Sequence, residues 1–225
     1  MSSGRAKLQR ALGRRFADEG LLELALTHRS AGGRNNERLE FLGDALINAC
    51  VAEALFRRHV EMEEGDLSRL RASLVNQDAL ADVARTLDLG SHLILGPGEL
   101  KSGGYRRASI LADALEALLG AVFLDAGFDA ARGVILHLLE PRLASPPSAE
   151  SLKDAKTRLQ ELLQGRELPL PVYEVVAVCG EPHQQLFRVS CSVAPLQIRT
   201  EGEAGSRRGA EQEAARQALE KIQHG

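Results

Sequence analysis

The sequence predicts two domains of different fold classes: a mostly α domain over residues 1–144 and a smaller α+β domain over residues 152–225. Three observations support this prediction. Apolar residues recur at helical spacing through most of the first part. β-forming residues with partial alternation occur after residue 171. Between the two parts, residues 145–151 are small, polar and rich in proline, which is typical of a linker.

The spacing of apolar residues in the first part predicts a series of helices. They are expected over residues 21–26, 38–56, 67–86, 109–124 and 130–143. The third of these follows an acidic turn at residues 63–66, which favours a helix start. A glycine-rich loop at residues 96–107 separates the third helix from the fourth.

The second part has the order helix, three strands, helix. Leu159, Leu162 and Leu163 share one side of a helix expected at residues 155–164. The strands are expected over residues 172–178, 186–193 and 196–200, and an alanine-rich helix over residues 206–222. This α-β-β-β-α order suits a sheet with two helices on one face.

Composition places the chain among ordinary globular proteins. Its 225 residues carry a formal net charge of −3, with a pI near 6.1, whereas nucleic-acid-binding domains are often strongly basic. A nucleic-acid site would therefore depend on local basic clusters.

No stretch of eighteen apolar residues occurs, and the first residues lack the hydrophobic core of a signal peptide. Cys50, Cys179 and Cys191 are scattered, which argues against a disulfide framework or a zinc site. We therefore expect a cytoplasmic protein without membrane contact.

Two otherwise apolar helices each carry a pair of acids. Glu40 and Asp44 lie four residues apart in the helix at 38–56, and Asp113 and Glu116 lie three apart in the helix at 109–124. Each pair therefore shares one helical face. An ionised carboxylate is costly to bury without a partner. Residues 39–52 and 110–124 contain no Lys or Arg that could pair with these acids, and Arg38, Arg106 and Arg107 lie at the edges of these stretches. If the two faces meet, a divalent cation is the natural neutraliser, and all-oxygen ligation favours Mg²⁺ or Mn²⁺ over zinc.

A second interpretation is that each pair lies on a solvated strip of its helix. Acids three or four residues apart are common in helices, so either pair alone favours this interpretation. Two matched pairs on two apolar helices favour a metal site instead. A carboxylate-held Mg²⁺ commonly serves phosphoryl chemistry. The spacing alone does not identify the reaction.

The residues around these acids resemble the signature of the ribonuclease III family. The stretch from Asn36 to Ala45 (NERLEFLGDA) carries the resemblance, with Ala45 where the family often has Ser. The match continues through residues 26–30, 64–68, 96–105 and 111–117, and with the C-terminal part it covers essentially the whole chain. The resemblance implies a ribonuclease III-like all-helical endonuclease domain followed by a double-stranded RNA-binding domain of the α-β-β-β-α fold.

The resemblance also implies roles for the acids. Glu40, Asp113 and Glu116 would be metal ligands, with Asp44 as a fourth member of the metal site. Mg²⁺ would be the cofactor, Mn²⁺ a substitute, and there would be no organic cofactor. Asp44 and Glu116 would be the residues most critical to catalysis, with Asp44 shaping the metal and water site.

Glu37 and Glu64 are expected to be secondary acidic residues, at the dimer or RNA channel and near the metal respectively. Each could instead be an ordinary acid in the first turn of its helix. His28, Ser30 and Ser109 are interpreted as structural, because nothing in sequence near them forms a nucleophile and base.

Contacts with RNA are expected in both parts. Double-stranded RNA-binding domains recognise A-form shape through phosphates and 2′-hydroxyls. In the second part these contacts would come from Thr157, Gln160, Glu161, His183, Ser206, Arg207 and Arg208. In the first part Lys101, Arg106 and Arg107 would approach the RNA near the cut site, or would be ordinary charges of a solvated loop.

One departure from the family pattern concerns the basic cluster at the start of the last helix. Where the family usually has a third basic residue, this chain has Glu211, followed by Glu213. Residues 152–225 contain ten basic and ten acidic residues, so this domain is neutral overall. We therefore expect a modest intrinsic affinity for duplex RNA.

The implied activity is hydrolysis of both strands of an RNA duplex by metal-activated water, leaving 5′-phosphate and 3′-hydroxyl ends with short 3′ overhangs. A twofold homodimer would match the two antiparallel strands, with exposed Phe41 in the contact. The family's substrates are ribosomal RNA precursors, some messenger and transfer RNA precursors and other structured transcripts. Two alternatives are a non-catalytic RNA-binding protein on the same scaffold and a helical module whose acids meet a basic protein partner.

Overall fold

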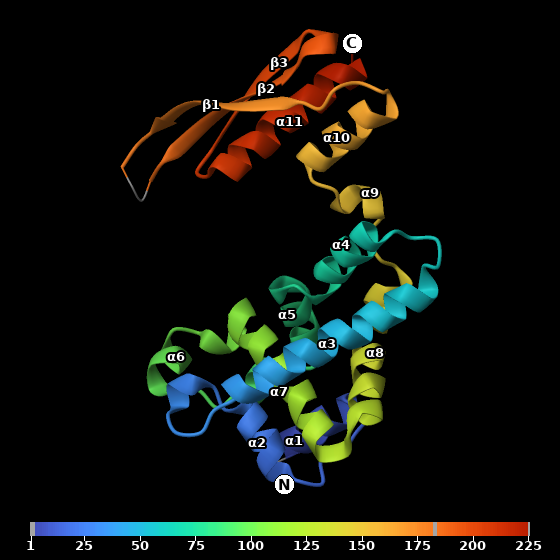
Figure 1. The fold of residues 1–225 in the computed structure, drawn as a ribbon. Helices are drawn as coiled ribbons and strands as arrows, with labels where there is room; N and C mark the ends of the chain where they lie inside the picture. The colour runs from blue at the N-terminus through green and yellow to red at the C-terminus, as the bar shows by residue number, and fades with distance from the viewer. Residues whose placement is uncertain (1–2, 182–183, 225) are drawn as a thin grey trace. The chain divides into compact units, whose positions relative to one another are not determined.

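The computed structural model describes residues 3–181 and 184–224, and it divides into two compact units, residues 1–149 and 150–225 (Figure 1). The division falls at the start of the short helix α9 (Ala149–Leu152), within the segment predicted to be a linker. The first unit is helical and the second combines helices with a sheet, so the predicted fold class is confirmed.

The first unit is organised around one buried helix. Its longer helices are α1 (Ser3–Ala11), α2 (Glu19–Leu26), α3 (Glu37–Arg58), α4 (Glu64–Val75), α5 (Gln77–Thr86), α7 (Ala108–Ala126) and α8 (Phe128–Ala144). The short helix α6 (Pro97–Lys101) and three 3-10 turns, Arg29–Ala31, Leu89–His92 and Gly104–Arg106, complete the unit. α7 is apolar on almost every side and packs against α2, α3, α5 and α8. A polar residue on α7 therefore lies close to a neighbouring element.

The helix predicted over residues 67–86 is in fact two helices. Asn76 ends α4 in an extended conformation, with φ −70° and ψ 164°. Its side-chain oxygen accepts a hydrogen bond from the backbone N–H of Ala79 at 2.9 Å, and this bond caps the start of α5. Asparagine is a preferred residue at this position because its side chain satisfies an N–H that the helix leaves unpaired. The continuous apolar spacing concealed the break.

Two helices of the structure lie in segments where the sequence predicted none. Residues 3–11 form α1, which the mixed basic and apolar pattern did not predict. The glycine-rich loop contains α6, which begins at Pro97. Proline is favoured at a first helical position because its fixed φ suits the helix and its missing N–H would be unpaired there anyway.

The second unit is a three-stranded antiparallel sheet with two helices on one face (Figure 1). The strands β1 (Val172–Cys179), β2 (Leu186–Val193) and β3 (Ile198–Ala204) lie in the order β1-β2-β3. The helices are α10 (Ala155–Gly165) and α11 (Arg207–His224). Side chains from the helices and the sheet form the core, which includes Leu159, Leu163, Cys191, Val193, Ala214, Ala215, Ala218 and Leu219.

The third strand begins and ends later than predicted. Residues 194–196 form a 3-10 turn, and Gln197 adopts a left-handed conformation with φ 54° before β3 starts. At its other end β3 continues to Ala204, which pairs with Phe187 of β2. Gly202 faces α11 so closely that a Cβ would lie 2.3 Å from the backbone oxygen of Ala210. The end of β3 has a weak β propensity, and its pairing with β2 and its packing against α11 keep it in a strand conformation.

Candidate active site

Two glycines allow α3 and α7 to cross at very short range. A Cβ on Gly43 would lie 1.8 Å from the backbone oxygen of Glu116, and a Cβ on Gly120 would lie 2.3 Å from that of Leu39. No other residue fits at either position without moving a backbone. Glu40 precedes Gly43 by three residues and Glu116 precedes Gly120 by four, so the crossing brings these two acids together.

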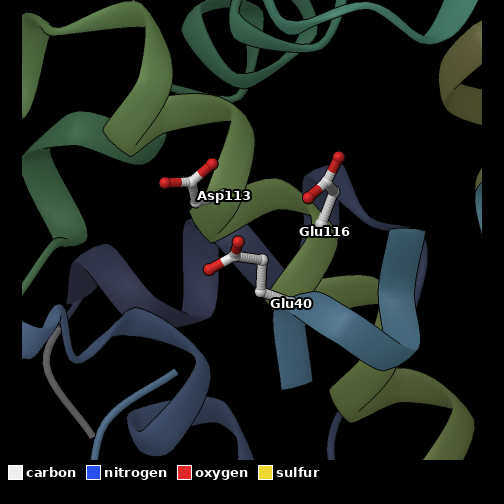
Figure 2. A group of neighbouring side chains, drawn as sticks. All are labelled: Glu40, Asp113 and Glu116. Carbon is white, nitrogen blue, oxygen red and sulfur yellow. The ribbon is translucent and has the colours of Figure 1, made fainter. Parts of the chain in front are cut away.

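Three acids gather at this crossing. Ligand oxygens of Glu40 on α3 and of Asp113 and Glu116 on α7 all lie within 4.8 Å of one another, and each residue is half-buried. Figure 2 shows the three carboxylates around one space between the two helices. Among residues 3–181 and 184–224, no Lys or Arg forms an ion pair with any of the three. The arrangement offers an all-oxygen binding site for a hard divalent cation.

The protonation of the cluster reflects its unbalanced negative charge. Burial, followed by the charges of Asp44, Asp113 and Glu40, raises the pKa of Glu116 to about 8. Burial also raises the pKa of Glu40 and that of Asp113, although the nearby positive charge of Arg29 opposes both shifts. A cation at this position would remove the electrostatic cost of ionising all three groups.

Asp44, the fourth predicted acid, lies outside this group of three. It is exposed on α3, and its carboxylate accepts a hydrogen bond from the side-chain amide of Asn48 at 2.9 Å. Its charge nonetheless contributes to the raised pKa of Glu116. The Asp44 carboxylate therefore influences the cluster from one turn further along α3.

The two secondary acids lie in different places. Glu37, at the start of α3, is 3.7 Å from Arg29 and lines the same cavity as Glu40 and Asp113. Glu64, at the start of α4, accepts a hydrogen bond from Ser68 at 2.7 Å and lines a separate, largely apolar cavity. Glu37 therefore shares a cavity with the acid cluster, whereas Glu64 does not.

The cavity beside the cluster, of about 320 Å³, is also lined by positive groups. Arg29 and Arg107 supply these positive charges, and the cavity is lined by His28, Glu40 and Asp113 as well. The guanidinium of Arg107 is held by Glu99, with an N–O distance of 3.1 Å. Arg29 was not predicted as a site residue, although it lies beside His28 in a segment that resembles the family. An anionic group that approaches a cation in the cluster would meet these positive charges as well.

Ser30 connects this cavity to the glycine-rich loop. Its hydroxyl lies 2.8 Å from Nδ1 of His28 and accepts a hydrogen bond from the backbone N–H of Gly96 at 2.9 Å. A Cβ on Gly96 would lie 2.0 Å from the backbone oxygen of Ser30. These contacts fix the start of the loop at the cavity.

The other predicted cations of the loop lie at its surface. Lys101 is exposed at the end of α6. Arg106 is exposed too, with its guanidinium carbon 5.1 Å from the centroid of the Tyr105 ring. Arg107 is the member of this group that lines the cavity of the acid cluster.

The second unit contains a polar groove between the starts of its two helices. The groove, of about 610 Å³, is lined by Asp154, Lys156, Thr157, Gln160, Arg207, Arg208, Glu211 and Gln212. Four residues predicted to contact RNA therefore share one surface: Thr157, Gln160, Arg207 and Arg208. Lys156, one residue before Thr157, was missed, although its charge and position could have indicated it.

The remaining predicted RNA contacts lie elsewhere. Glu161 is exposed on α10 and pairs with Lys153 at 2.6 Å. The hydroxyl of Ser206 accepts a hydrogen bond from the backbone N–H of Gly209 at 3.1 Å, at the start of α11. His183 lies outside the residues that the structure describes.

Neither unit contains, in the residues described, a helix with the length and apolar character needed to cross a bilayer.

Residues 18–143 match the family described as Ribonuclease-III-like, and residues 155–222 match the double-stranded RNA binding motif. The chain is 58% identical to Ribonuclease 3 of Bordetella avium over 96% of this chain and 86% of that protein. It is also 58% identical to Ribonuclease 3 of Thiobacillus denitrificans, over 97% of this chain and 96% of that protein.

The helical unit also resembles a solved structure of a ribonuclease III nuclease domain. The nuclease domain of ribonuclease III from Campylobacter jejuni is 45% identical, with a TM-score of 0.60, over 63% of this chain and 97% of that one. The helical unit and the sheet-containing unit thus each have known counterparts. The chain belongs to the ribonuclease III family of double-stranded RNA endonucleases and carries a double-stranded RNA-binding domain.

Proposed function

We propose that the chain hydrolyses both strands of duplex RNA at the cluster of Glu40, Asp113 and Glu116, with Mg²⁺ as the cofactor and Mn²⁺ as a substitute. The observation that carries this proposal is the gathering of three half-buried carboxylates within 4.8 Å of one another, with a raised pKa at Glu116. Among the described residues, no Lys or Arg forms an ion pair with these carboxylates. Such a set fits a hard cation, since oxygen ligands, negative charge and partial burial are all present.

The three carboxylates would hold the ion, and their neighbours would adjust the site. Burial and the neighbouring carboxylates raise the pKa of Glu116 to about 8, so a bound ion would favour its ionised form. Asp44 adds negative charge from the open side and is oriented by Asn48. When bound, the ion supplies Lewis-acid chemistry, which offsets phosphate charge and makes water a better nucleophile.

The positive groups of the cavity suit the RNA backbone. Arg29 and Arg107 line the cavity together with Glu40 and Asp113, where they would attract phosphate and orient it. The bond from Arg107 to Glu99 holds its guanidinium in place before RNA arrives. In-line attack at phosphorus would leave 5′-phosphate and 3′-hydroxyl ends.

A homodimer would supply one acid cluster for each strand of a duplex. The strands of a duplex are related by a pseudo-twofold axis, which a twofold dimer matches. Phe41 on α3 is 81% exposed, and Leu42 and Leu124 line a neighbouring cavity of about 640 Å³. An exposed aromatic side chain, with leucine side chains in the lining of a cavity that begins at the next residue, is suited to a self-complementary contact. A solved nuclease domain of ribonuclease III from Campylobacter jejuni shows structural flexibility in a region involved in dimer formation.

The groove of the second unit would contact the duplex through Thr157, Gln160, Arg207 and Arg208, with Lys101 and Arg106 adding contacts near the cut site. Substrates of this kind are double-stranded parts of ribosomal RNA precursors and of some messenger and transfer RNA precursors. Two cuts offset across the minor groove would leave short 3′ overhangs. We place this activity in the cytoplasm.

The test uses a perfect RNA duplex labelled at its 5′ end and the full chain. We expect cleavage of both strands with Mg²⁺ or Mn²⁺, none with a chelator, and loss of cleavage in Glu116→Gln with duplex binding retained. Products should be substrates for a ligase that requires a 5′-phosphate. Binding without metal-dependent cleavage would instead indicate a non-catalytic RNA-binding protein, and no duplex binding would indicate a protein-interaction module.

A further inference from the structure

Glu211 is held between two cations, one for each of its carboxylate oxygens. Lys156 Nζ donates to Oε2 at 2.5 Å, and Arg207 Nε donates to Oε1 at 2.9 Å. Lys156 belongs to the first turn of α10 and Arg207 to the first turn of α11, so the acid joins the two helices. The Glu211 side chain is 12% exposed, compared with 33% for Lys156 and 65% for Arg207. The acid thus lies inside and the cations nearer the surface.

Lys156 is restrained in this position by two other contacts. Its Nζ lies 4.5 Å from the centroid of the Tyr173 ring on β1, which is close enough for a cation–π interaction. Its backbone N–H donates to the side-chain oxygen of Gln212 at 3.1 Å. Lys156 is therefore presented to the groove in a fixed geometry, with less freedom than a lysine on an open surface.

The charges of the groove nearly cancel. Its lining contains three basic residues, Lys156, Arg207 and Arg208, and two acidic ones, Asp154 and Glu211, which leaves a net charge of +1. The hydrogen bond from Lys156, and then the one from Arg207, lower the pKa of Glu211, so this carboxylate is ionised at neutral pH. Glu211 is thus the acid in direct contact with two of the three cations.

We propose that Glu211 is an internal counterion that competes with RNA phosphate for Lys156 and Arg207, that Lys156 is itself a phosphate contact, and that Glu211 thereby limits how tightly the groove holds a duplex. An ammonium has three donors and a guanidinium five, so each cation can bind a phosphate while it keeps its bond to Glu211. The carboxylate nevertheless repels that phosphate at short range. Without it the same donors would hold phosphate more strongly.

This inference rests on the proposed contact of Arg207 and Arg208 with phosphate, and the test separates the two. Binding of a fluorescent RNA duplex to the full chain is measured in chelator, at several salt concentrations. We expect Glu211→Gln to bind several-fold more tightly, with a slope of log K against log salt that is steeper by roughly one. Lys156→Gln should bind more weakly, with a slope shallower by a similar amount.

Glu213→Gln is the matched control, because it removes the same charge from the same helix. Glu213 pairs with Arg216 at 2.6 Å and does not line the groove. If Glu211→Gln bound no more tightly than Glu213→Gln, or more weakly than the unaltered chain, Glu211 would serve to position the cations and the inference would be wrong. Lys156→Gln tests the phosphate contact of Lys156 even if Glu211→Gln fails to fold. Unchanged duplex binding by Lys156→Gln would overturn that contact.

A double variant reports on the underlying contact. If Arg207→Ala with Arg208→Ala left binding unchanged, the phosphate site itself would be misplaced and the inference would fail with it. If that variant bound weakly while Glu211→Gln equalled Glu213→Gln, the phosphate site would stand and the counterion inference alone would fail.

Discussion

Gly43 on α3 lies against the backbone of Glu116 on α7, so closely that a Cβ on Gly43 would be 1.8 Å from the Glu116 oxygen. The geometry of the acid cluster therefore depends on a residue that carries no side chain. Because the atoms on both sides of this contact belong to helix backbones, a methyl group can be accommodated only if the helices separate.

We expect Gly43→Ala to lower the free energy of unfolding by about 1–3 kcal/mol or more, the usual cost of overpacking. Cleavage should fall further than stability explains, because separation of the helices moves Glu40 away from Glu116. Gly133→Ala in α8 is the matched control, since a Cβ there has no neighbour within 4 Å. The control should be as stable as the unaltered chain or more so. Denaturant unfolding and initial cleavage rates would measure both effects, and normal activity in Gly43→Ala would contradict the prediction.

The raised pKa of Glu116 predicts a pH dependence of stability in the absence of metal. Its pKa is about 8 in the folded chain, against an ordinary value of 4.5, so between these values the folded state keeps a proton that the unfolded chain releases. The free energy of unfolding should therefore fall as pH rises from about 4.5 to about 8. Thermal melting in chelator would measure this slope. Glu116→Gln should flatten it and raise the melting temperature near pH 8, and an equal slope in both proteins would refute the assignment.

Divalent metal should stabilise the chain more at high pH than at low pH. Binding requires ionised carboxylates, so below the raised pKa values of Glu40, Asp113 and Glu116 the ion must displace protons. We expect the rise in melting temperature on addition of Mg²⁺ to be larger at about pH 8 than at about pH 6, and to be lost in Glu116→Gln. The control is Glu64→Gln, because Glu64 lies in a different cavity. A metal effect that is the same at both pH values would argue against binding at this cluster.

Phe41→Glu should convert a dimer into a monomer. The Phe41 side chain is 81% exposed, and a carboxylate in its place would be buried without a partner in any contact that covers it. Phe56→Glu is the control, because Phe56 is 72% exposed near the other end of the same helix. Sedimentation at micromolar concentration should give a monomer for the first and a dimer for the second. A dimer in both cases would place the contact elsewhere.

The sequence by itself determined the division into a helical part and an α+β part, and it identified the acids that could bind a metal. Helical spacing and a switch to β-forming residues are local properties that the chain displays directly. Glu40, Asp44, Asp113 and Glu116 interrupt two stretches, residues 39–52 and 110–124, that are otherwise mostly apolar, and an ionised group in such a place needs a partner.

The tertiary structure alone decided which of these groups meet. Glu40, Asp113 and Glu116 come together because two glycines let α3 and α7 touch, while Asp44 lies one turn further on. The break at Asn76 and the extension of β3 to Ala204 likewise depend on capping and strand pairing rather than on apolar spacing. The bond from Glu211 to Lys156 joins residues 55 positions apart in the chain. Distances between separate helices are set by packing, and no spacing along the chain encodes them.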